Sequence, residues 1–242
     1  MLPACHSGTA LGLKMKPERL ATIISILGVV LTSASVIASI AQYRAADLQA
    51  KAAVVTLMPQ IEVRTFLEKI DSQNYTDRRI EVTSDGGPIY NFELSRLSWI
   101  EFRVDKRVAY EQPIIGYYVV GYPTGRTRGT LTTIEGHRNH EYFIRFLGWV
   151  KPLLGADVEI SEPLTLMRMH YLDAFKQAKI SYVLIDGSSK THLSDEAGEQ
   201  LWNRRMREQQ TTTPLGIDQL RSNIGSADEI NTWKSKIAEA RK

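Results

Sequence analysis

The chain has 242 residues, of which 24% are charged and 43% are hydrophobic, and its net charge at pH 7 is +3. This composition is typical of a folded protein, and the small charge excess argues against a nucleic-acid partner, which needs a basic face to neutralise phosphates. The single cysteine, Cys5, excludes an intrachain disulfide and with it a small secreted scaffold stapled by disulfides.

An uncharged segment begins after Arg19 and ends before Arg44. Its sequence is LATIISILGVVLTSASVIASIAQY, 24 residues that as a helix would extend about 36 Å, whereas the hydrocarbon core of a bilayer is about 30 Å thick. We therefore predict a transmembrane helix over 20–43, preceded by an N-terminal flank over 1–19.

A cleaved signal peptide is the main alternative for this segment. A charged start over 16–19 and an apolar core over 20–31 precede small residues at 32–34, the pattern that signal cleavage requires. A buried helix of a soluble core is the third interpretation. Met15 stands directly before Lys-Pro-Glu-Arg and is an alternative start, in which case residues 1–14 are not part of the protein.

The basic residues that flank the segment favour one orientation slightly. Three precede it and two follow it within the range that governs insertion, which places the N-terminus in the cytoplasm. A start at Met15 would remove this difference. We expect a single-pass protein of a cell membrane, specifically the bacterial inner membrane, with the following domain on the extracytoplasmic side and the lipid bilayer as its first partner.

Small residues recur four positions apart in the apolar segment, with Ala34 matched to Ala38 and Ser35 matched to Ser39. Such pairs let two membrane helices approach closely. We therefore expect helix–helix contact at these four positions and a homo-oligomer held by the membrane helix. The alternative is that small residues are simply common in membrane helices.

The pattern changes from helix to strand at Pro59. An alanine-rich stretch over 44–58 predicts a helical stalk, which the proline ends. Beyond it, apolar residues alternate with polar ones, the period of a half-buried strand. About ten short strands are expected, over 61–65, 79–82, 90–94, 100–104, 114–122, 130–134, 142–146, 158–160, 164–171 and 180–185. The run over 114–122 is almost wholly apolar and predicts a central strand buried on both faces.

The fold class that follows is mainly β with helical ends. Short strands separated by turns predict an antiparallel β-sandwich or barrel-like domain over 59–190. The tail over 191–242 is expected to be helical, because Ser194 can cap one helix and Ser226 begins a capping box before another.

Sites for metals, cofactors and catalysis are not expected. His137, His140 and Glu141 could ligate zinc, but they lie in a predicted turn with no further ligand marked, so a polar loop is the better interpretation. The chain contains no Gly-x-Ser-x-Gly elbow, no Ser-x-x-Lys that would start a dyad, and no phosphate-binding loop. We therefore expect no enzyme activity.

Two groups of arginines are candidate contacts for a partner or for lipid. Arg126 and Arg128 lie at the tip of a predicted hairpin, where they could meet a phosphate, a lipid headgroup or an acidic partner. Arg204, Arg205 and Arg207 lie on one predicted helix and could contact anionic lipid. In both cases an ordinary solvated surface is the alternative.

Aromatic residues are dense in the second half of the predicted domain, at Tyr117, Tyr118, Tyr122, Tyr142, Phe143, Phe146 and Trp149. A carbohydrate or peptide platform would use such rings, but packing between two sheets explains them more simply.

The sequence favours a membrane-anchored protein whose β-rich domain is a binding or sensing module for an unknown protein or small ligand. Two other functions stay open. One is a membrane-perturbing effector that acts through its oligomerising transmembrane helix. The other is a hydrolase or carbohydrate binder that is secreted after signal cleavage.

Overall fold

The computed structural model describes residues 17–69, 76–121, 123–136, 138–222 and 227–242. Several positions named above lie outside these ranges, namely Cys5, Met15, Tyr122, His137 and Ser226. The chain divides into two units, Met1–Val55 and Thr56–Lys242.

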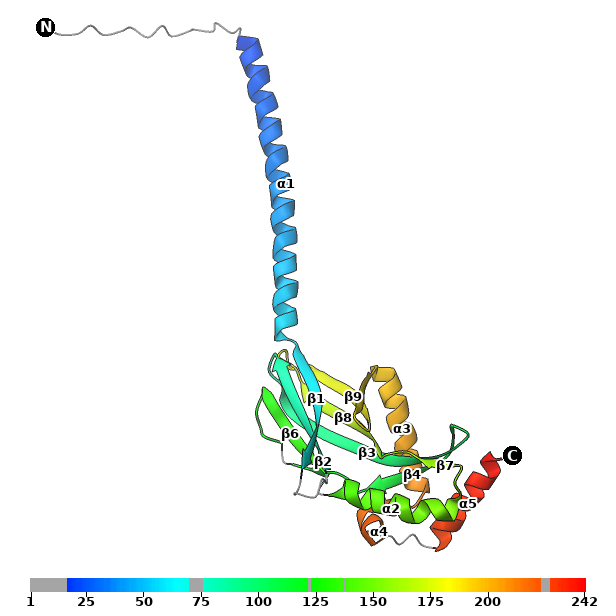
Figure 1. Ribbon diagram of the computed structural model, residues 1–242. Coiled ribbons are helices and arrows are strands. Elements are labelled where there is room, and N and C mark those ends of the chain that lie inside the picture. The colour runs from blue at the N-terminus through cyan, green and yellow to red at the C-terminus, as the bar shows by residue number, and fades with distance from the viewer. Residues whose placement is uncertain (1–16, 70–75, 122, 137, 223–226) are drawn as a thin grey trace, which may run out of the picture. The chain divides into compact units, whose positions relative to one another are not determined.

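The first unit contains most of helix α1 (Pro17–Leu57), which confirms a helix over the uncharged segment (Figure 1). None of its apolar window is buried, and the helix is long and apolar enough to cross a membrane. Several of its hydroxyl groups are satisfied within the helix: Thr32, Ser35 and Ser39 each donate to a backbone carbonyl three or four residues earlier. Back-bonding of this kind removes the cost of placing a hydroxyl in hydrocarbon.

The helix ends where the sequence predicts, and β1 begins at Pro59. The amide of Gly87 donates to the carbonyl oxygen of Met58 at 3.2 Å, which fixes the start of β1 against the turn after β2. A Cβ at Gly87 would lie 1.7 Å from the carbonyl oxygen of Leu57, so no side chain fits there.

The second unit contains two β-sheets that do not close into a barrel, which confirms a mainly β domain with helical ends. The smaller sheet has the strand order β1 (Pro59–Lys69), β2 (Thr76–Gly86), β6 (Gly129–Glu135) and β5 (Val119–Val120). The larger sheet has the order β10 (Ser189–Leu193), β9 (Ala178–Asp186), β8 (Leu164–Leu172), β3 (Tyr90–Val104), β4 (Arg107–Ile115) and β11 (Leu215–Gly216), with β7 (Val158–Ile160) also on β3. The strand pairs are antiparallel except β11 with β4.

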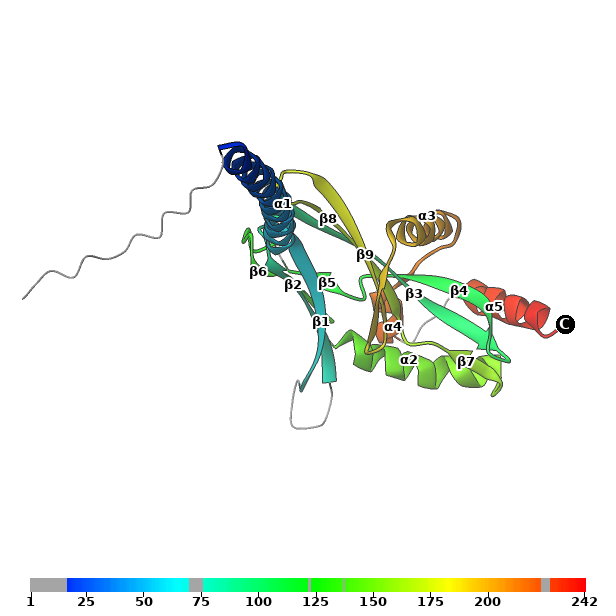
Figure 2. The ribbon, with the colours of Figure 1, turned by 90° about the horizontal axis from the view of Figure 1, so that it is seen from above.

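Helices cover both faces of the larger sheet. They are α2 (Asn139–Leu154), α3 (Asp195–Thr211), α4 (Ile217–Ser222) and α5 (Ala227–Ala240). Helices α2 and α3 lie on opposite sides of β3, β8 and β9, as both views show (Figures 1 and 2). The side chain of Ser194 caps α3 by accepting from the amide of Ala197, as the sequence predicts.

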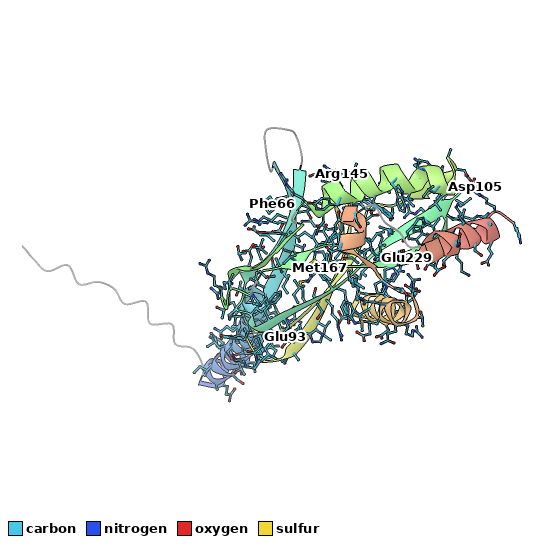
Figure 3. The ribbon with its side chains drawn as sticks, turned by 90° about the horizontal axis from the view of Figure 1, so that it is seen from below. Phe66, Glu93, Asp105, Arg145, Met167 and Glu229 are labelled. Atoms are coloured by element: carbon cyan, nitrogen blue, oxygen red, sulfur yellow. The ribbon has the colours of Figure 1, made fainter. Side chains whose placement is uncertain are left out.

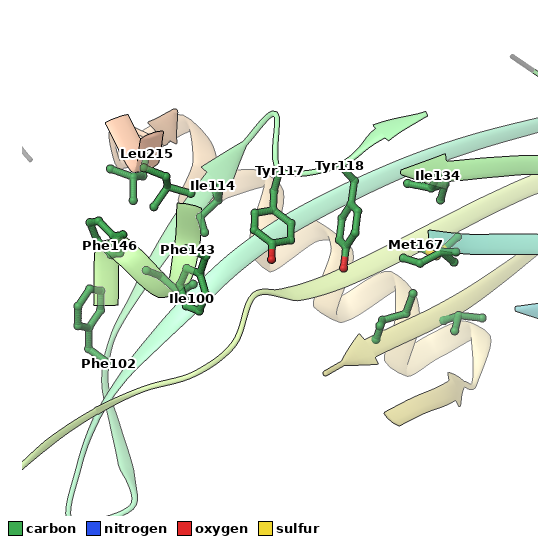
Figure 4. Packing of buried hydrophobic residues seen from close by; sticks show 14 of the residues in the cluster. Ile100, Phe102, Ile114, Tyr117, Tyr118, Ile134, Phe143, Phe146, Met167 and Leu215 are labelled. Carbon is green, nitrogen blue, oxygen red and sulfur yellow. The ribbon is translucent and has the colours of Figure 1, made fainter. Parts of the chain in front are cut away.

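The alternation of side chains along β3 divides the core into two clusters. Ile100 and Phe102 point into the larger cluster, with α2 and the smaller sheet, whereas Trp99 points into the cluster beneath α3. Figure 4 shows the rings of Tyr117 and Tyr118 side by side in the larger cluster. Figure 3 places Met167 inside the domain, in contrast to the exposed residues Glu93, Asp105 and Arg145 at its surface. Four of the seven predicted core aromatics, Tyr117, Tyr118, Phe143 and Phe146, are buried in the larger cluster, and Tyr142 and Trp149 are partly buried against it.

The prediction of a strand over 142–146 is wrong, because these residues belong to α2. Their alternation fits a strand, but the buried residues of the whole segment recur every three or four positions: Asn139, Phe143, Phe146, Val150 and Leu154. That spacing places one helical face against the core. The strand prediction was wrong because it used only five residues, whereas the helical spacing of the buried residues is visible only over the longer segment.

The prediction of a central strand over 114–122 is also wrong. Residues 114–115 end β4, Gly116 turns the chain at a φ of 77°, and β5 lies at the edge of the smaller sheet. The segment is apolar because Tyr117 and Tyr118 are buried between the sheets as the chain passes from one to the other.

Candidate functional site

The structure places Arg126 and Arg128 on the segment that joins β5 to β6, where both are exposed. Neither forms an ion pair within the described residues. Arg126 borders a cavity of about 340 Å³ whose wall includes Tyr90 and Phe92. A second cation, Lys176, lies 3.1 Å above the ring centre of Tyr90.

The three arginines of α3 differ in their surroundings. Arg204 and Arg207 are exposed. Arg205 is 5% exposed, and its guanidinium contacts Glu111 at 2.5 Å and Glu208 at 2.7 Å. Arg205 therefore belongs to the interior of the domain and not to an exposed basic face.

The four predicted helix-contact residues, Ala34, Ser35, Ala38 and Ser39, are all exposed on α1. Ser39 donates to the carbonyl oxygen of Ser35 at 2.8 Å, so the two serines are satisfied without a second helix. No cluster of three or more potential metal ligands occurs among the described residues.

A different site lies where the chain passes between the sheets. The strand β4 pairs with β3 from Ser98 onward, and after Gly116 the chain leaves toward β5. Residues 95–97 therefore pair only with β8 within the described chain. A cavity of about 310 Å³ occupies the place that a continuing β4 would fill. This cavity, the Arg96 cavity, is lined by Ser95, Arg96, Leu97, Ser98, Ile114, Ile115, Gly116, Tyr117, Tyr118 and Gln209.

Side chains satisfy the backbone of the crossing segment, which has no strand partner at this point. Asn139 donates from its amide nitrogen to the carbonyl oxygens of Gly116 at 3.3 Å and Tyr117 at 2.5 Å. The guanidinium of Arg96 donates to the carbonyl oxygen of Tyr118. Buried carbonyl groups need such partners, so Asn139 and Arg96 hold the crossing in place.

Arg96 occupies a position that the strand pattern assigns to the core. Phe92, Leu94, Ile100 and Phe102 share one face of β3, and Arg96 lies in the same row. The next position in this row, Ser98, is also polar, and its hydroxyl lies 2.9 Å from the hydroxyl of the buried Thr165 on β8. A polar patch thus interrupts an otherwise apolar face.

Arg96 has no carboxylate partner among the residues that the structure describes. Arg96 is half-buried and forms no ion pair in the described part of the chain, and its burial lowers the pKa of the guanidinium. Arg205 shows the contrast: burial also opposes its charge, but Glu111 and Glu208 outweigh burial and raise its pKa. The buried Arg78 likewise pairs with Glu162, which raises the pKa of Arg78 against the effect of burial.

A larger cleft of about 500 Å³ runs along α5 and includes Tyr110, Glu229 and Lys236. Two of its charged groups are engaged, since Lys236 pairs with Glu239 and Glu229 accepts from Gln219, and the third, Asp228, is exposed to solvent. The Arg96 cavity is smaller, but its charge still lacks a partner. It is therefore the stronger candidate site.

The sequence contained a signal for this site. An arginine and a serine interrupt the alternating row of β3 between Leu94 and Ile100, and a polar residue facing a core needs a partner. The alternation by itself predicts two separate strands over 90–94 and 100–104, which places Arg96 and Ser98 in a connection between them.

Searches with family models, with curated protein sequences and with solved structures find no significant match to this chain.

Proposed function

We propose that this protein is a single-pass membrane protein whose β-rich domain is a binding or sensing module, with the Arg96 cavity as its binding site. The observation that carries the anchor is the uncharged segment within α1, none of whose apolar window is buried. Apolar surface of this extent is costly in water, and a bilayer removes that cost.

The chemistry of the cavity supports binding and not catalysis. Its lining includes one charged side chain, Arg96, and no histidine, carboxylate, lysine or cysteine that would serve as a general base or activated nucleophile. Its volume lies at the lower end of the range for small-molecule sites. A small ligand that contacts β3, β4, the crossing segment and α3 would link the conformations of these elements, which is what a sensor requires.

Carbonate extraction of membranes from cells that express the full chain tests the anchor. We expect the wild-type protein to stay in the pellet. Val30→Lys should release it, because a lysine at the centre of a span costs about 2.5–3.5 kcal/mol. The control is Val55→Lys, an exposed position in the last turns of the same helix, which should leave the protein in the pellet. Release of the wild-type chain would contradict the proposal.

The side of the membrane and the fate of the helix need separate experiments. We propose the bacterial inner membrane as the location, with the domain on the extracytoplasmic side. A C-terminal fusion to paired reporters, each active on one side only, tests that orientation. Sequencing of the mature N-terminus tests the alternative of a secreted protein: a start within 32–42 would mean that the segment is cleaved and that no anchor remains.

A further inference from the structure

We propose that the Arg96 cavity binds a small organic anion, with a carboxylate or phosphate group of the ligand against the Arg96 guanidinium. This inference rests on the proposed function, because it names the class of ligand for the binding site described above. It is carried by the composition of the cavity wall, by the missing counter-charge and by the free edge of β3.

The guanidinium of Arg96 lacks a carboxylate partner among the described residues. A guanidinium stays charged in proteins, so its burial must be offset by an anion or by hydrogen-bond acceptors. The domain supplies carboxylates to the two arginines that are described as buried, Arg78 and Arg205. For Arg96 it supplies one backbone carbonyl, that of Tyr118. An anionic ligand would supply the charge that the protein gives to the other two.

The geometry of the N–H donors of Arg96 also favours an anion. A guanidinium carries five N–H donors in a rigid planar fork that matches the two oxygens of a carboxylate or phosphate. The hydrogen bond to Tyr118 uses one terminal nitrogen of Arg96, and Arg96 is part of the cavity wall. Ser95 and Gln209 in the wall can donate neutral hydrogen bonds, and no acidic residue lines the cavity to repel an anion.

The size and the apolar part of the wall limit the ligand. A volume of about 310 Å³ admits a small molecule and not a polymer segment. Leu97, Ile114 and Ile115 provide an apolar side. A short carbon skeleton that bears one or two anionic groups fits this combination better than a bare inorganic ion or a sugar.

Protection of Arg96 from phenylglyoxal, measured by mass spectrometry on the full-length protein in detergent micelles, tests the proposal. The probes are inorganic phosphate and acetate, compared with sodium chloride at the same ionic strength. We expect either oxyanion to slow the labelling of Arg96 at least fivefold relative to chloride. Labelling of the exposed Arg107, which lies at the start of β4 and away from the cavity, should not change and serves as the internal control. The proposal would be overturned if phenylglyoxal labelled Arg96 at the same rate in phosphate, acetate and chloride. It would also be overturned if Arg96 were not labelled under any of these conditions.

Matched variants separate binding from a purely structural role of Arg96. Arg96→Gln should lose the rise in melting temperature that phosphate gives the wild type, whereas Arg107→Gln, at an exposed position away from the cavity, should keep it. Arg96→Lys retains the charge and a donor for Tyr118 but lacks the fork, so we expect its affinity for phosphate to fall at least tenfold. This variant decides the matter if Arg96→Gln does not fold. Wild-type affinity in Arg96→Lys would show that the fork is not used and would contradict the geometry proposed here.

The two proposals can fail separately. A chain that carbonate releases, but whose Arg96 is protected by phosphate, contradicts the anchor alone. A chain that stays in the pellet, but whose Arg96 is not protected, contradicts the anion site alone.

Discussion

The guanidinium carbon of Arg205 lies 4.0 Å from the ring centre of Trp99, so that a buried cation on α3 covers an aromatic ring on β3. The same guanidinium contacts Glu111 of β4 and Glu208 of α3. One side chain therefore joins α3 to β3 through a cation–π contact and to β4 through an ion pair, while the pair with Glu208 stays within α3. This contact borders the Arg96 cavity, because Ser98 and Gln209 line both the cavity and the space beside Arg205.

Removal of this arginine should loosen α3. We expect Arg205→Met to destabilise the protein by about 3 kcal/mol, because it leaves Glu111 without its partner. Arg204→Met, on the exposed side of the same helix, should change stability by less than about 0.5 kcal/mol. Thermal unfolding of both variants in the same mild detergent measures the difference. Equal melting temperatures would mean that the contact contributes nothing.

Substitution by alanine should have opposite effects on stability at two helical glycines, Gly198 and Gly148. A Cβ at Gly198 of α3 would lie 2.2 Å from Cγ of Tyr182, whereas a Cβ at the exposed Gly148 of α2 would have no atom within 4 Å. Gly198→Ala should therefore destabilise the protein by about 1–3 kcal/mol through overpacking. Gly148→Ala should stabilise it by about 0.5–1 kcal/mol, because alanine favours the helix. Denaturant midpoints check both signs, and a stabilising Gly198→Ala would refute the close packing of α3.

The bond between Tyr182 and Glu199 predicts a pH dependence. The Tyr182 hydroxyl donates to Glu199, and this bond lowers the carboxyl pKa against the effect of burial, with help from Asn203 and the charge of Arg168. A lowered folded-state pKa adds stability above the ordinary glutamate value of about 4.3. That contribution disappears as the pH falls through the lowered pKa.

Comparison of the wild type with Glu199→Gln over pH 3–7 measures this effect. We expect the wild type to be the more stable at neutral pH and the difference to shrink as the pH falls below about 4. A difference that stays constant over this range would show that the carboxylate does not contribute. Tyr182→Phe removes the donor and should reduce the pH dependence in the same way.

Association of α1 with a second copy predicts an effect of side-chain size at two positions. Ala34→Leu combined with Ala38→Leu should convert an oligomer into a monomer in detergent, because the larger side chains prevent close approach. Ile37→Leu keeps the volume and should leave the oligomer intact. Cross-linking and sedimentation of the full chain measure the result. An oligomer that survives the double substitution would place the contact elsewhere and would remove the basis for an effector that acts through this helix.

Local pattern alone was sufficient for several elements. The uncharged segment predicted α1, Pro59 predicted its end, and the cap at Ser194 predicted the start of α3. The strands β1, β2, β6, β8 and β9 followed from the alternation of apolar and polar residues. In each case neighbouring residues in the chain contain the whole signal, because helix and strand periods and caps are local properties.

Other elements depended on distant partners. Residues 142–146 taken alone fit a strand, whereas in the structure Phe143 and Phe146 enter the larger core cluster from one face of a helix. The turn at Gly116 interrupts an apolar run that by itself predicts a strand.

The sequence by itself determined that an uncharged helix precedes a β-rich domain, because hydrophobicity and period are fixed by residue order. Only the tertiary structure decided that Arg96 faces a cavity without a carboxylate and that Arg205 faces two of them. Both are arginines in amphipathic segments of the same chain. What separates them is the set of side chains that folding brings within a few ångströms, and Coulomb and hydrogen-bond energies depend on that distance.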